Sequence, residues 1–62
     1  GQAFRAETAR HAVEFIVGQA KKLGVKVIGA DFLPAEINLQ KPFLANGFLP
    51  SPKAENYLIK PL

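Results

Sequence analysis

The chain has 62 residues, enough for one small domain that buries roughly 60% of the surface of its unfolded chain. It has no cysteine and a single histidine, which excludes disulfides, thiolate metal sites and any pair of histidine ligands. The net charge of +3 is too small to indicate nucleic-acid binding, and no apolar run approaches the length of a membrane span.

The beginning of the chain carries no basic region followed by an apolar run, so we expect no secretory signal and a cytoplasmic location. The chain starts on Gly-Gln-Ala-Phe, without methionine, and we interpret residues 1–62 as one small domain that is a fragment of a larger one. Hydrophobic residues make up 48% of the sequence, which favours a face that covers something larger over a compact core alone.

The first predicted element is a long amphipathic helix over residues 4–23. Apolar residues recur there at spacings of three and four, and Phe15 and Val17 widen the apolar surface. The glycine at position 24 supplies the helix stop. The residues expected to share the core-facing stripe are Ala9, Ala12, Val13, Ile16, Ala20 and Leu23.

A strand is predicted over residues 25–33. It is rich in β-branched residues, and apolar side chains occupy both alternating sets, which is typical of a central strand buried on both faces. A long helix that leads through one glycine into such a strand is the second half of a β-α-β unit. We therefore expect a parallel neighbour strand upstream, outside this chain.

A short helix is predicted near residues 38–45, with Asn38 as its N-cap and an irregular turn over residues 34–37. This start places Pro42 at the fourth helical position, where its missing N–H costs nothing. Gly47, with Asn46 beside it, is expected to end the helix in the left-handed conformation.

Two short strands close the chain, at residues 48–49 and 56–60, and they should pair as a hairpin around a proline turn at residues 50–53. We therefore predict a mixed α/β fold, more specifically of the α+β class. It consists of a three-stranded, mainly antiparallel sheet with one long and one short helix.

This order of elements resembles the C-terminal half of the GNAT N-acetyltransferase fold, and most closely the acetyltransferase-like domain of FkbH-type proteins. Three segments carry the resemblance. Gly1-Gln2-Ala3 is similar to the end of the family's glycine-rich loop before the long helix. Gly29-Ala30-Asp31-Phe32-Leu33-Pro34 is similar to its strand that ends in an aromatic-x-Pro segment. Phe43-Leu44-Ala45-Asn46-Gly47-Phe48 is similar to its Phe-Tyr-x-x-x-Gly-Phe signature.

The resemblance implies contacts to acetyl-coenzyme A or another acyl-coenzyme A, and no metal. The residues that it assigns to the coenzyme are Gly1, Gln2, Ala3, Phe4, Asn38 and Phe43. Backbone N–H groups at the start of a helix can bind an anion such as the pyrophosphate of coenzyme A. Many members of the family have a tyrosine at the position of Phe43, where it protonates the leaving thiolate. Phenylalanine has no proton to give, so we assign no catalytic residue.

Two hypotheses follow for function. The chain is either a fragment of a GNAT-like acyltransferase domain that contacts acyl-coenzyme A, or a non-catalytic module of that shape that docks on a neighbouring domain or a carrier protein. The remainder of the parent domain is a further expected partner, and the chain alone is expected to self-associate through a sheet edge. Weak stability of the chain alone is the alternative to this self-association, and no nucleic-acid or membrane partner is expected.

Three other residues have a chemical and a plainer interpretation. Asp31 is either a base near substrate or a carboxylate at a sheet edge or capping a donor, and the plainer role is favoured. His11 is expected to be a solvated helix residue, and Tyr57 a packing residue of the last strand.

Overall fold

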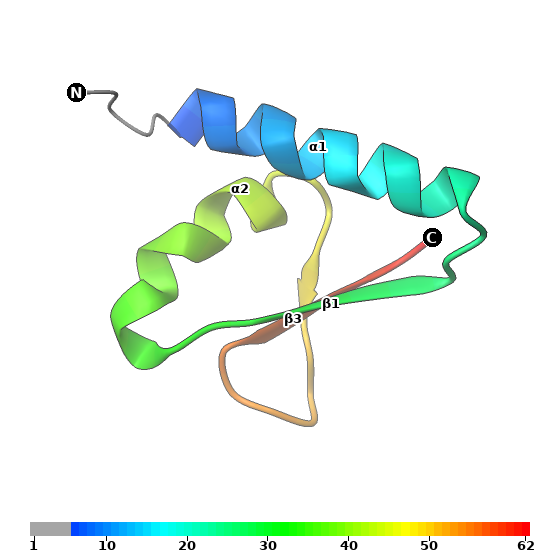
Figure 1. The fold of residues 1–62 in the computed structure, drawn as a ribbon. Helices are drawn as coiled ribbons and strands as arrows, with labels where there is room; N and C mark the ends of the chain where they lie inside the picture. Colours follow the sequence, from blue (N-terminus) through cyan, green and yellow to red (C-terminus); the bar gives the residue numbers. More distant parts are fainter. Residues whose placement is uncertain (1–5) are drawn as a thin grey trace.

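The structure is a computed structural model, and it describes residues 6–62. A long helix is followed by a strand, a 3₁₀-helix that runs into a short α-helix, and two further strands (Figure 1). The elements are α1 (Ala6–Lys22), β1 (Val27–Asp31), η1 (Pro34–Gln40), α2 (Lys41–Leu44), β2 (Leu49–Pro50) and β3 (Tyr57–Pro61).

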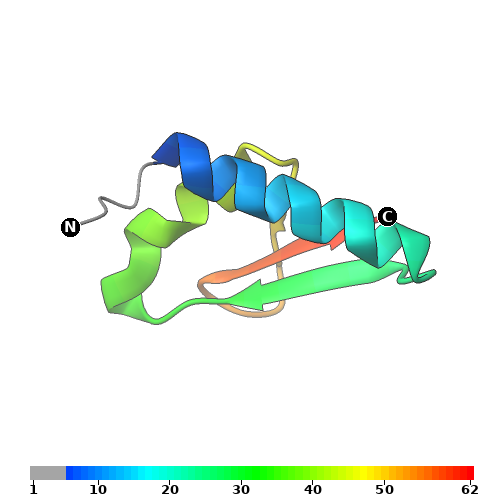
Figure 2. The ribbon, with the colours of Figure 1, turned by 45° about the horizontal axis from the view of Figure 1, so that its top comes forward.

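The three strands form one antiparallel sheet in the order β1-β3-β2. β3, the last strand in sequence, therefore lies between the other two, with Gly29 opposite Ile59 on one side and Leu49 opposite Ile59 on the other. α1 lies over one face of this sheet and runs alongside β1 (Figures 1 and 2). The predicted α+β class, with a three-stranded antiparallel sheet and two α-helices, is confirmed.

The core lies between α1 and the sheet. Its buried side chains are Val13, Val17, Phe32, Phe48 and Leu58, and Ile28, Ala30, Phe43 and Leu62 pack against them. Alternation along the strands explains this selection, because Ile28, Ala30 and Leu58 point to the face that α1 covers.

The buried stripe of α1 differs from the predicted one. Val13 and Val17 are buried, whereas Ile16 is 55% exposed and Leu23 81% exposed. The apolar side of α1 is wider than the stripe that the sheet covers. As a result, the flank of the helix that carries Ile16 and Leu23 stays uncovered.

Both α-helices end on glycine, as predicted. Gly24 has φ +79° and Gly47 has φ +86°. At each end two hydrogen bonds reach back into the last turn: Gly24 N–H to Lys21 O and Val25 N–H to Ala20 O, then Gly47 N–H to Leu44 O and Phe48 N–H to Phe43 O. This pair of bonds is the Schellman motif, which requires the left-handed conformation that glycine adopts without strain.

The predicted start of the second helix was wrong. Helical structure begins at Pro34, as the 3₁₀-helix η1, and changes to α-helix at Lys41. Asn38 is therefore inside η1 and is not an N-cap. The backbone N–H of Leu33 instead donates to Glu36 Oε1 at 2.9 Å, and Pro42 lies in the first turn of α2.

Strand positions differ from the predictions in two places. β1 is shorter than residues 25–33 and is an edge strand of the described sheet, with Val27 54% exposed, so burial on both faces was wrong. The parallel neighbour strand stays a prediction. Pro50, expected in the turn, lies in β2, which tolerates it because β2 is an edge strand. The predicted hairpin of the last two strands is confirmed.

Candidate functional site

A hollow of about 500 Å³ opens between the first half of α1, the end of β1 and the segment η1–α2. Ala9, Ala12 and Val13 line it from the helix, and Asp31 and Phe32 from the end of β1. The opposite wall is formed by Glu36, Asn38, Leu39, Lys41, Pro42 and Phe43. Its size and its mainly apolar lining with a few polar groups are those of a small-molecule pocket.

Two of the predicted coenzyme-contacting residues, Asn38 and Phe43, both line this hollow. Asn38 is exposed on η1, and Phe43 is half-buried on α2. The other four predicted residues, Gly1, Gln2, Ala3 and Phe4, lie outside the described residues. In sequence they directly precede α1, whose residue Ala9 reaches the hollow.

The ring of Phe43 is the centre of an aromatic cluster under the hollow. Its centroid lies 5.2 Å from that of Phe32 and 5.3 Å from that of Phe48, and both pairs are edge-to-face. Such pairs contribute about 0.5–1.5 kcal/mol each beyond the area that they bury. Phe43 therefore joins this wall of the hollow, and with it α2, to the core.

Asn46 fixes α2 against α1, a role that the sequence did not reveal. Its side-chain amide Nδ2 donates to Arg10 O of α1 at 2.9 Å and to Pro42 O of α2 at 2.8 Å. The sequence marked Asn46 as a helix-end residue, but its long-range partner is 36 positions away and leaves no local signal. This link sets the distance between two walls of the hollow.

The charged groups of the hollow are Asp31, Glu36 and Lys41. Asp31 stands at the exposed end of β1, opposite Tyr57 in the ladder, which fits its expected place at a sheet edge. The Glu36 carboxylate accepts a hydrogen bond from the backbone N–H of Leu33, so it caps the N-terminal end of η1. Sequence reasoning did not single out Lys41, which lies on the same wall as Asn38.

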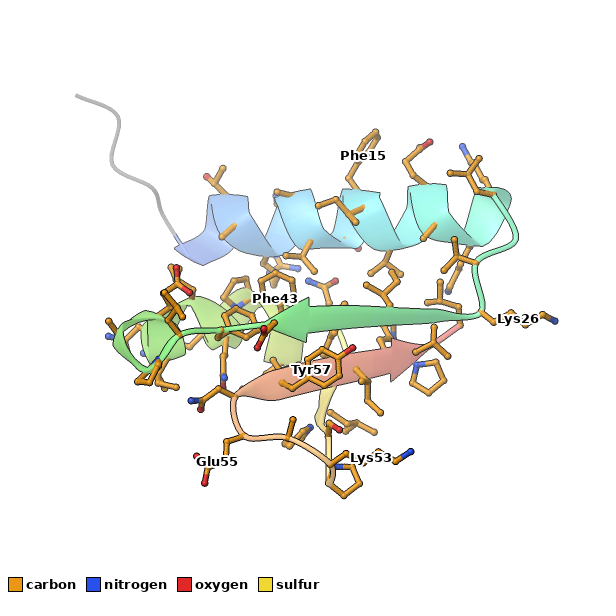
Figure 3. All side chains as sticks on the ribbon, turned by 60° about the horizontal axis from the view of Figure 1, so that its bottom comes forward. Phe15, Lys26, Phe43, Lys53, Glu55 and Tyr57 are labelled. Carbon is orange, nitrogen blue, oxygen red and sulfur yellow. The ribbon has the colours of Figure 1, made fainter. Side chains whose placement is uncertain are left out.

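Neither Tyr57 nor His11 lines this hollow. The Tyr57 side chain crosses the face of the sheet turned away from α1 (Figure 3), and its Cζ lies 2.9 Å from where a Cβ at Gly29 would stand. The missing side chain of Gly29 thus makes room for the tyrosine ring, which supports the packing role. His11 is exposed on α1, and its Nε2 is 3.1 Å from Nη2 of Arg10.

A second hollow, of about 440 Å³, lies at the β2–β3 connection and is lined by Gln40 and residues 50–58. It contains none of the predicted site residues. Its lysine, Lys53, is exposed and so offers a matched comparison for Lys41.

Within the part of the chain that the structure describes, no three His, Cys, Asp or Glu side chains gather as metal ligands would. None of the helices in residues 6–62 combines the length and apolar composition that crossing a bilayer needs. No family model, curated protein or solved structure matches this chain.

Proposed function

We propose that this chain is part of a GNAT-like acyltransferase domain and that the hollow beside α1 contacts an acyl-coenzyme A, such as acetyl-coenzyme A. The observation that carries the proposal is that Asn38 and Phe43 line the same hollow as the first half of α1. The order of helix, strand, short helix and hairpin is also the order that the resemblance implies. The proposal includes the contacts to the coenzyme that the resemblance implies for Gly1 to Phe4.

The chemistry of the lining suits the arm of such a coenzyme. Ala12, Leu39 and Phe43 offer apolar surface to the acyl and pantetheine carbons, and the Asn38 amide can both donate to and accept from the amides of the arm. The ammonium group of Lys41 suits the phosphates, which carry the negative charge of the coenzyme. In this proposal the lining residues bind the coenzyme, and none of them is a proton donor for the reaction.

A second candidate, the non-catalytic docking module, is favoured by the surroundings of Phe43. This residue stands where the resemblance puts an acid, and both of its ring contacts serve the core. A domain that keeps the shape without the acid would bind a neighbouring domain or a carrier protein through the same region. This module would leave free acetyl-coenzyme A unbound.

A titration of the ¹⁵N-labelled chain with acetyl-coenzyme A tests the proposal. We expect amide shifts at residues 2–5 and around Asn38 and Phe43. Lys41→Glu should weaken binding several-fold, because it replaces an attractive charge at the hollow with a repulsive one. Lys53→Glu should leave binding within about twofold, since it changes the net charge equally but lies at the other hollow.

Either of two results would overturn the coenzyme proposal. One is the absence of amide shifts at millimolar acetyl-coenzyme A. The other is equal weakening by both lysine variants, which would indicate attraction by net charge alone. The first result would leave the docking module as the better description of this domain.

A further inference from the structure

Within residues 6–62, no strand lies beside the outer edge of β1. The hydrogen bonds Phe32 N–H to Asn56 O, at 2.9 Å, and Leu62 N–H to Lys26 O, at 2.8 Å, flank the β1–β3 ladder. The backbone N–H and C=O groups of the even-numbered residues in this segment thus face β3. Because backbone direction alternates along an antiparallel strand, the N–H and C=O groups of Val27, Gly29 and Asp31 point away from the sheet.

Among the described residues this edge has little of the usual protection, because its one charged residue, Asp31, stands at the end of the strand. Val27–Asp31 contains neither proline nor lysine, and its register with β3 is uninterrupted from end to end. The opposite edge of the sheet differs, because β2 has two residues and one of them is Pro50, which has no N–H to donate. A strand that extends this sheet would therefore add beside β1.

An uncovered apolar flank of α1 lies on the same side of the molecule. Ala12 and Ile16 of α1 and Leu23, which directly follows the helix, are spaced by four and seven residues and lie along one stripe. Ala12 lines the hollow together with Asp31 of β1, and α1 runs alongside β1 (Figures 2 and 3). The stripe therefore follows the free edge, with Ile16 and Leu23 both largely exposed above it.

Within the described residues this flank carries no charged side chain, which is a condition for contact with a second copy of itself. In a two-fold contact each side chain near the axis meets its own copy, so a charge there would meet a like charge. The residues of the flank are Ala12, Ile16, Gln19 and Leu23, whereas Arg10, Glu14 and Lys21 lie on the other flank of α1. The surface is therefore compatible with a second copy of itself.

We propose that two copies of this chain pair through β1 about a two-fold axis that passes perpendicular to the sheet beside Gly29. Such an axis reverses the strand direction and keeps both α1 helices on one face. With Gly29 opposite Gly29 and Val27 opposite Asp31, the outward groups form hydrogen-bonded pairs. The two apolar flanks then face each other over a continuous sheet. This inference goes beyond the proposed function, since it needs no ligand, and it places a second copy of this chain on the β1 edge where the sequence predicts an upstream parallel strand.

Sedimentation equilibrium of the whole chain, from about 10 μM to about 1 mM, tests the dimer. We expect Ile16→Glu to weaken dimerisation about tenfold or more, because it buries two unpaired carboxylates near the axis. Leu44→Glu is the matched control, since Leu44 is a 46% exposed helix residue of α2, and it should leave the dimer unchanged. A monomer throughout this range, or equal loss in both variants, would overturn the proposal.

Amide hydrogen exchange tests the role of the edge and contains its own control. The amides of Val27, Gly29 and Asp31 should become protected as the concentration rises, whereas those of Ile28 and Ala30, bonded to β3, should be protected at every concentration. A dimer in which the three outward amides still exchange freely would use another surface and would refute the pairing through β1. Neither outcome depends on whether acetyl-coenzyme A binds.

Discussion

Single residues decide how closely the parts of this small molecule approach one another. Asn46 joins α2 to α1 through two backbone carbonyls, and Phe43 joins α2 to the core through two edge-to-face rings. Gly29 leaves the space into which Tyr57 packs. Each of these residues acts through a partner far away in sequence.

The Asn46 contacts lead to a prediction with an asparagine control. Asn46→Ala should lower the free energy of unfolding by about 1–2 kcal/mol, because it removes two hydrogen bonds and leaves the Pro42 carbonyl without its donor. Asn38→Ala should change it by less than about 0.5 kcal/mol, since Asn38 is exposed. Urea unfolding followed by circular dichroism measures both. Equal losses would contradict the assignment of Asn46 as the tie between the helices.

At the scale of elements, glycine has opposite effects at different positions. Gly24 and Gly47 adopt positive φ and close the Schellman ends of α1 and the η1–α2 segment. Gly18 lies inside α1 and has open space where a Cβ would point. The first two glycines are required by the backbone, and the third only weakens the helix.

Alanine at two of these positions should therefore act with opposite signs. Gly18→Ala should stabilise the fold by about 0.5–1 kcal/mol, because alanine favours the helix interior. Gly47→Ala should destabilise it by about 1 kcal/mol or more, since it strains a residue at φ +86° and places a Cβ 2.8 Å from Lys60 Nζ. Thermal and urea unfolding of the two variants supply the comparison. A stabilising Gly47→Ala would show that the helix does not end as described.

The whole molecule has a small core for its apolar content. Five side chains are buried in the described residues, whereas large apolar residues such as Phe15, Leu23, Leu33 and Leu49 are more than half exposed. A core of this size supports only a few kcal/mol of stability by itself. The molecule should therefore gain stability from whatever covers its open surfaces.

The melting temperature should accordingly depend on protein concentration. If the folded dimer is the stable form, mass action raises the melting temperature as the concentration increases. In Ile16→Glu the melting temperature should be lower and independent of concentration. Calorimetry over a hundredfold range of concentration provides the measurement. A sharp, high melting transition that ignores concentration would contradict both the weak core and the dimer.

Local patterns in the sequence determined the long helix, its glycine end, the glycine end of the short helix and the closing hairpin, because hydrophobic period, left-handed glycines and proline turns act over a few residues. The predicted start of the second helix was wrong. The Glu36 carboxylate caps a helix that begins at Pro34, rather than one that begins after Asn38. Of the candidate site, the sequence marked Asn38 and Phe43, by resemblance, and missed Lys41 and the Asn46 tie.

Tertiary structure decided which side of each element is covered. The apolar set of α1 is wider than its buried stripe, so only packing on the sheet separated the buried Val17 from the exposed Ile16. The order β1-β3-β2 made β1 an edge, although its apolar residues on both sides indicated a central strand. Burial depends on which surfaces meet, and such contacts join residues too far apart in sequence for a local pattern to record.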